Sequence, residues 1–127
     1  MKKNLIIDDE KEITKSFLTA LERYGYEVSI YGDPFEALAE FKPNVYELVI
    51  IDIGLPRVNG FSIYRRLVER DREVNVCFLT NVEVRKNEFD ILFPDLHVNF
   101  FLTKPLSVPA LMKHVQITIH QCEHTSR

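Results

Sequence analysis

An apolar run that ends on a single carboxylate constrains the fold of this chain most. The run Leu48–Ile51 leads into Asp52, and Gly54 and Pro56 follow it. A short run rich in β-branched residues and bounded by Gly and Pro predicts a strand buried on both faces, as in a parallel sheet between helices. Asp52 is therefore expected at the carboxyl end of that strand, where open α/β sheets bind their ligands.

The N-terminal stretch has the same form, because the apolar run Leu5–Ile7 leads into Asp8, Asp9 and Glu10. If the two strands are neighbours, Asp8, Asp9 and Asp52 converge. Two carboxylates about 4 Å apart repel by roughly 4 kcal/mol at an effective dielectric constant near 20. A shared proton, a lysine or a hard cation could offset this repulsion. Oxygen-only ligands favour Mg²⁺ over zinc.

Composition limits the class of protein. A chain of 127 residues, 46% of them hydrophobic, predicts one domain over residues 1–127 with a sizeable core. The net charge of -3 gives no basic surplus for nucleic-acid binding by this chain alone. No apolar run is long enough to span a membrane, and Met1–Asn4 leads into a strand rather than a signal peptide, so a cytoplasmic location is expected. Cys77 and Cys122 are a poor pattern for a disulfide framework, which agrees.

Apolar strands and amphipathic helices alternate along the chain. Strands are predicted at residues 5–7, 27–31, 48–53, 74–79 and 98–103, and helices at 10–24, 34–42, 61–68 and from 108 onward. The segment Val82–Phe93 has no clean apolar stripe and predicts a short, irregular fourth helix. This alternation predicts an α/β fold with a five-stranded parallel sheet and right-handed crossovers.

Polar residues mark the helix ends. Asp33 before Pro34, with Glu36 at the third helical position, is typical of a capping-box N-terminus. Ser107 can cap the last helix. At the end of the third helix, Asp71 is expected on the solvent-exposed side with its charged neighbours.

The strand ends bring five polar side chains to one rim of the predicted sheet, namely Asp8, Asp9, Asp52, Thr80 and Lys104. Their chemistry suits phosphoryl transfer, with Asp52 as the nucleophile, Lys104 as a cation for the phosphoryl oxygens and Thr80 as a hydroxyl donor. Mg²⁺ would be held by Asp9 directly, by Asp8 through a water, by Asp52 and by the backbone carbonyl of Gly54. Three acids against one lysine leave a deficit of two positive charges, which one Mg²⁺ fills.

Four sequence motifs contain or flank these rim residues. In order, they are Ile6–Glu10, Val49–Pro56 with Asn59 and Gly60, Leu79 with Thr80, and Phe101–Pro105. With these motifs, nearly the whole chain resembles the receiver domain of two-component response regulators. The resemblance implies a flavodoxin-like (βα)5 three-layer sandwich with strand order 2-1-3-4-5. It also implies that a phosphohistidine of a sensor histidine kinase or phosphotransfer protein donates to Asp52 in a Mg²⁺-dependent reaction. The receiver would catalyse only this acceptance and the later hydrolysis, without being an enzyme in the ordinary sense.

The resemblance further implies a switch made of Thr80 and Phe101. Thr80 would be drawn toward the phosphoryl group and Phe101 would turn into the space left behind, shifting the population between two packings. Phe101 lacks the hydroxyl of the commoner tyrosine, so its switch would rest on packing alone. The altered surface would be that of the fourth helix, fifth strand and fifth helix, through which a homodimer could form.

The chain departs from the family pattern at two positions. Gly54 replaces a common methionine and would leave the site more open to water. Asn81 replaces a small alanine and would either narrow the phosphoryl pocket or donate to it.

Other functions remain as alternatives. A degenerate receiver would act as a phosphorylation-independent interaction module. A phosphatase of the haloacid dehalogenase type needs a second acid where this chain has Gly54. Flavin binding is disfavoured because acids line the rim that would take an anionic phosphate. The group His120, Cys122 and His124 resembles a small metal cluster, but a frayed helix end is the favoured interpretation.

Overall fold

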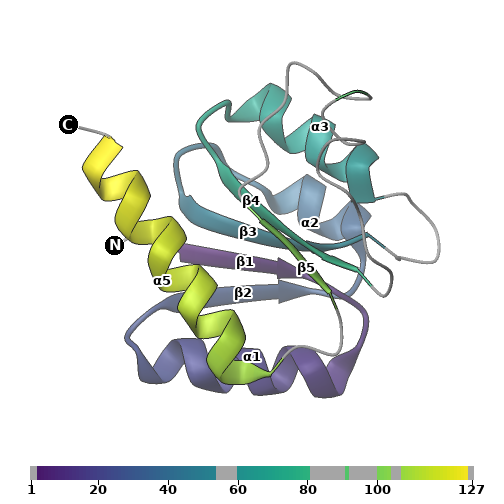
Figure 1. Cartoon of the computed structure of the whole chain (residues 1–127). Coiled ribbons are helices and arrows are strands. Elements are labelled where there is room, and N and C mark those ends of the chain that lie inside the picture. Colours follow the sequence, from purple (N-terminus) through teal and green to yellow (C-terminus); the bar gives the residue numbers. More distant parts are fainter. Residues whose placement is uncertain (1–2, 54–59, 81–90, 92–99, 104–106, 126–127) are drawn as a thin grey trace.

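The computed structural model describes residues 3–53, 60–80, 91, 100–103 and 107–125 (Figure 1). One parallel sheet contains β1 (Lys3–Ile7), β2 (Glu27–Tyr31), β3 (Tyr46–Asp52), β4 (Asn75–Thr80) and β5 (Phe100–Thr103). The helices are α1 (Lys11–Arg23), α2 (Pro34–Glu40), α3 (Gly60–Arg70) and α5 (Val108–Thr125). The strand order β2-β1-β3-β4-β5 confirms the predicted flavodoxin-like topology. The expected irregular fourth helix lies outside the described residues, except for residue 91.

Helices cover both faces of the sheet, with α1 and α5 on one side and α2 and α3 on the other (Figure 1). Successive strand residues point to opposite faces. Leu5 and Ile7 of β1 therefore join the core under α2 and α3, whereas Ile6 joins the core under α1 and α5. This two-sided burial explains why β1, β3 and β4 contain continuous apolar runs instead of alternating ones.

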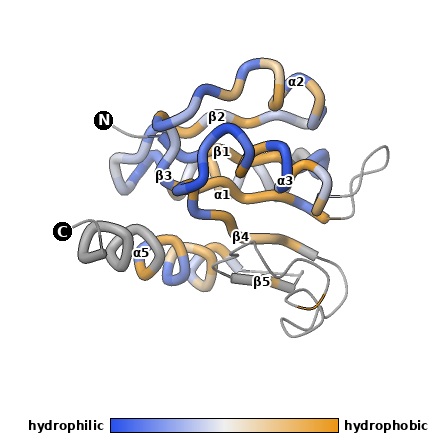
Figure 2. Tube along the Cα trace, turned by 90° about the horizontal axis from the view of Figure 1, so that it is seen from above, coloured by the Kyte–Doolittle hydropathy of each residue, from blue (hydrophilic) through white to orange (hydrophobic). Residues whose placement is uncertain are grey.

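The central strand β3 forms the middle of both cores. Its four residues from Leu48 to Ile51 are each 0% exposed, and burying side chains of this size stabilises a fold by roughly 1.5–3 kcal/mol each. The neighbouring strand β4 is also largely hydrophobic in Figure 2, whereas α3 carries both hydrophobic and hydrophilic segments. This contrast is expected when a buried sheet lies between helices that each have one exposed face. The sheet is therefore a rigid base for the residues at its carboxyl edge.

The predicted helix starts of α2 and α5 are confirmed. The side chain of Asp33 accepts a hydrogen bond of 2.9 Å from the backbone N–H of Phe35, and Pro34 is the first helical residue. The Oγ of Ser107 accepts one of 3.2 Å from the N–H of Ala110. Each side chain satisfies an N–H group that the first helical turn leaves without an intrahelical partner.

The expectation for Asp71 was wrong, because this residue is buried with 8% of its surface exposed. Its Oδ2 accepts a 3.0 Å hydrogen bond from the N–H of Asn44, which lies in the left-handed region at φ 66°. Its Oδ1 accepts another, of 3.1 Å, from the N–H of Glu73. Asp71 thus ties the turn after α3 to the loop before β3. A carboxylate that accepts two backbone donors is accommodated away from water.

Within the described part of the chain, no helix combines the length and the hydrophobicity needed to cross a bilayer.

Candidate functional site

Asp52 is the last residue of β3, as predicted, and lies between the ends of β1 and β4. It pairs with Leu79 of β4, and the N–H of the next residue, Ile53, donates a 2.9 Å hydrogen bond to the carbonyl of Leu79. Its side chain is only 2% exposed. The sheet therefore fixes the backbone on which this carboxylate stands.

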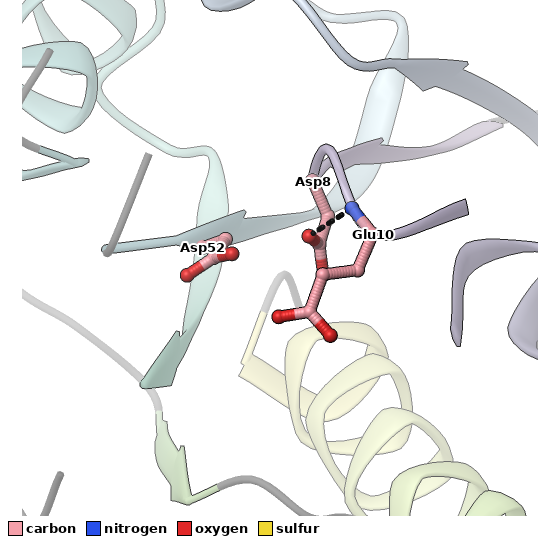
Figure 3. A group of neighbouring side chains, drawn as sticks. All are labelled: Asp8, Glu10 and Asp52. Carbon is pink, nitrogen blue, oxygen red and sulfur yellow. Dashed lines mark hydrogen bonds between the residues drawn. The ribbon is translucent and has the colours of Figure 1, made fainter. Parts of the chain in front are cut away.

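Asp8 follows β1 directly and is also 2% exposed. Its N–H donates a 3.1 Å hydrogen bond to the carbonyl of Tyr31, the last residue of β2. Its Oδ1 accepts a 3.0 Å hydrogen bond from the N–H of Glu10, drawn in Figure 3. Asp8 is thus held from one side by the sheet and from the other by the start of α1.

The carboxylates of Asp8, Glu10 and Asp52 form one group, in which the ligand oxygens all lie within 4.8 Å of one another (Figure 3). The sequence predicted the convergence of Asp8 and Asp52, and the structure brings them together. It adds Glu10, which the predicted ligand set lacks. Asp9 is exposed and lies outside this group.

The sequence offered only a partial signal for Glu10, which is the third acid of the run that follows β1. The backbone of Glu10 is extended, with φ −82° and ψ 95°, but the chain bends at Asp9. The alternation of side chains along β1 therefore does not extend past Asp8, and it does not predict which of the next two acids lies beside Asp52.

The other predicted site residues are placed only by their position in the chain. Thr80 is the last residue of β4 and pairs with Thr103, the last residue of β5, so both backbones reach the same edge as Asp52. The side chains of Thr80 and Phe101 lie outside the described residues. Gly54, Asn81 and Lys104 lie outside them entirely, as do the side chains of His120, Cys122 and His124.

The donor set fits a hard divalent cation. All three groups are carboxylates whose ligand oxygens lie within 4.8 Å of one another. Two charges at about this limit repel by roughly 3 to 4 kcal/mol at an effective dielectric constant of about 20. A hard cation that binds oxygen offsets this repulsion, and carboxylates are its usual protein ligands. Where a phosphoryl group joins such a site, the same cation can neutralise part of its charge.

Two hydrogen bonds involve residues next to the rim. The N–H of Gly60, the first residue of α3, donates a 3.4 Å hydrogen bond to the carbonyl of Ile53, directly after Asp52. On the other side, the hydroxyl of Tyr31 donates to the carboxylate of Glu40 in α2. This hydrogen bond is the main reason why the pKa of Tyr31 is raised to about 12.

Comparison with known proteins places this arrangement in a family. The sequence profile of the response regulator receiver domain matches residues 5–116. The chain belongs to this family. Receiver domains of two-component systems are signalling switches, and the match indicates no enzyme family.

Similar proteins include transcriptional regulators. The receiver is 29% identical over 117 residues to the transcriptional regulatory protein DltR of Streptococcus agalactiae, with 92% of this chain and 51% of DltR covered. It is 29% identical over 123 residues to the alkaline phosphatase synthesis transcriptional regulatory protein PhoP of Bacillus subtilis, with 96% and 50% covered. The receiver thus spans about half the length of these relatives.

Solved structures share the fold. A CheY-like receiver domain protein from Methanospirillum hungatei matches with a TM-score of 0.86, 23% identity and 98% of each chain covered.

Proposed function

We propose that Asp52 of this receiver accepts a phosphoryl group from the phosphohistidine of a sensor histidine kinase or a phosphotransfer protein. A carboxylate oxygen of Asp52 attacks the phosphorus, the bond from phosphorus to the histidine nitrogen breaks, and an aspartyl phosphate forms. Later, water attacks the phosphorus and releases inorganic phosphate and the carboxylate. The proposal is carried by the placement of Asp52, buried at the end of β3 with its carboxylate beside those of Asp8 and Glu10.

The reaction is proposed to require Mg²⁺, held by Asp8, Asp9, Asp52 and the backbone carbonyl of Gly54. When bound, the ion would neutralise charge on the phosphoryl oxygens. Lys104 would contribute a second cation and Thr80 a hydroxyl donor to the same oxygens. The meeting of the β3, β4 and β5 carboxyl ends at one edge supports these assignments.

The proposed readout is a change in packing. Thr80 and Phe101 would move together once Asp52 is phosphorylated and alter the surface formed by the fourth helix, β5 and α5. A second copy of the receiver could pair through that surface. Because the relatives are transcriptional regulators of about twice this length, we propose that the receiver controls an output without contacting nucleic acid itself.

A cytoplasmic location is part of the proposal. Cys77 is a buried thiol in β4, which suits the reducing compartment in which disulfides are rare.

Intact-mass spectrometry tests the phosphoacceptor directly. The wild-type protein is incubated with acetyl phosphate and Mg²⁺, and we expect an adduct of one phosphoryl group. The adduct should be absent in Asp52→Asn and when a chelator replaces Mg²⁺. Asp33→Asn is the matched control, since Asp33 is the N-cap of α2 and asparagine caps a helix about as well as aspartate.

An adduct that persists in folded Asp52→Asn would contradict the assignment of Asp52. A folded wild-type protein that never acquires phosphate would instead favour the phosphorylation-independent interaction module. Multiple turnovers on a phosphate ester would point to an enzyme.

A further inference from the structure

Glu10 is the N-cap of α1, but its side chain makes no capping hydrogen bond. Its backbone N–H donates to Oδ1 of Asp8, and its carbonyl accepts hydrogen bonds of 3.1 Å from the N–H and 3.2 Å from the Oγ1 of Thr14. The backbone of Glu10 is therefore fixed on both sides. Figure 3 shows its carboxylate extending over the rim on the side of Asp52.

The distances suit shared coordination. Mg²⁺ and Ca²⁺ bind oxygen at roughly 2.0–2.6 Å, so two oxygens on one ion lie no more than roughly 4 to 5 Å apart. The oxygens of Asp8, Glu10 and Asp52 meet this limit, because all lie within 4.8 Å of one another. Moreover, Glu10 is exposed whereas Asp8 and Asp52 are buried. Glu10 therefore adds an exposed carboxylate to two buried ones.

We propose that Glu10 supplies a carboxylate oxygen to the divalent cation at this site, in addition to the ligands predicted from the sequence. The inference rests on the proposed function, because it needs a cation beside Asp52. It gives the receiver a ligand from the start of α1, so that cation binding joins the ends of β1 and β3 to this helix.

The test measures Mg²⁺ binding to the unphosphorylated protein by ¹H–¹⁵N NMR titration, with Mg²⁺ alone as the probe. We expect Glu10→Gln to weaken the affinity about tenfold or more, the range seen when groups that support a metal site are lost. Glu22→Gln is the matched control, since Glu22 is an exposed residue of the same helix, and its affinity should stay within twofold of wild type. The amide spectra also show whether each variant is folded.

Ionic strength separates a ligand from a distant charge. At about 1 M salt the Debye length is roughly 3 Å, so a merely electrostatic contribution of Glu10 would be screened. A Glu10→Gln deficit that persists there supports coordination, whereas one that disappears overturns it.

Asp52→Asn separates this inference from the proposed function. Unchanged affinity in Glu10→Gln together with reduced affinity in Asp52→Asn would overturn the role of Glu10 alone. Unchanged affinity in both variants would overturn the cation site itself.

Discussion

Gly60 packs directly against the backbone of Asp52. A Cβ atom at Gly60 would lie 3.1 Å from the carbonyl oxygen of Asp52 and 2.8 Å from the Cα of Ile53. Both neighbouring atoms belong to the backbone, so no flexible side chain could move aside. The absence of a side chain at Gly60 therefore lets the first turn of α3 lie against the end of β3.

Gly60→Ala is expected to destabilise the fold by about 1–3 kcal/mol, the usual range for overpacking a tight site. The steric effect should exceed the gain in helix propensity of at most about 1 kcal/mol. Urea unfolding measures the stability, and phosphate acceptance should slow because the backbone of Asp52 shifts. Ser62→Ala, an exposed change two residues further along α3, should leave both quantities near wild type. A Gly60→Ala protein as stable as wild type would show that the backbone yields easily.

Asp71→Ala should lower the free energy of unfolding by about 2–3 kcal/mol. It removes the charged acceptor of two part-buried hydrogen bonds, from the N–H groups of Asn44 and Glu73, and a hydrogen bond to a charged group contributes about 1.5–3 kcal/mol. Asp71→Asn should cost less, because its one side-chain oxygen can still accept. Chemical denaturation measures both, with exposed Arg72→Ala expected within about 0.5 kcal/mol of wild type. Equal stability of Asp71→Ala and Arg72→Ala would contradict this account.

The Tyr31 hydroxyl should make the free energy of unfolding depend on pH in the alkaline range. The folded pKa of about 12 lies above the ordinary value of 10.0, so the folded state binds this proton more tightly than the unfolded state. The contribution is fully present below pH 10 and is lost as the pH rises toward 12. Tyr31→Phe should be less stable than wild type by at most about 1 kcal/mol near neutral pH. This difference, measured by urea unfolding, should shrink between about pH 10 and 12. A constant difference would argue against the hydrogen bond to Glu40.

Mg²⁺ should stabilise the folded receiver, because a ligand that binds only the folded state raises the free energy of unfolding. At a Mg²⁺ concentration ten times the dissociation constant, the gain should be about 1.4 kcal/mol. Thermal or urea unfolding measures this gain, and a chelator should reverse it. In Asp52→Asn the gain at the same Mg²⁺ concentration should be smaller. Equal stabilisation of both proteins would place the bound ion elsewhere.

The elements predicted best were those whose signals are local. The run Leu48–Ile51 is apolar at every position because both faces of β3 are covered, and this pattern is legible without any partner. Asp33 and Ser107 were recognised as caps because a cap bonds to an N–H only two or three residues away. The predicted rim followed from one rule, that the carboxyl ends of parallel strands meet at one edge.

The misses depended on contacts distant in sequence. Asp71 was predicted to be one more exposed charged residue at a helix end, but it is buried and accepts a hydrogen bond from Asn44, 27 positions away. Glu10 was absent from the predicted ligand set, which took Asp8 and Asp9 from the acidic run after β1. In the structure the carboxylate of Glu10 lies with those of Asp8 and Asp52, and Asp9 is exposed outside this group.

The sequence by itself determined the α/β class, the order of its elements and which carboxylate ends the central strand, since these follow from periodicity and from the chemistry of neighbouring residues. Only the tertiary structure decided which acids face Asp52 and that Asp71 is an internal anchor. Those outcomes depend on how side chains from separate segments are oriented once the helices pack on the sheet, and no local pattern encodes that orientation.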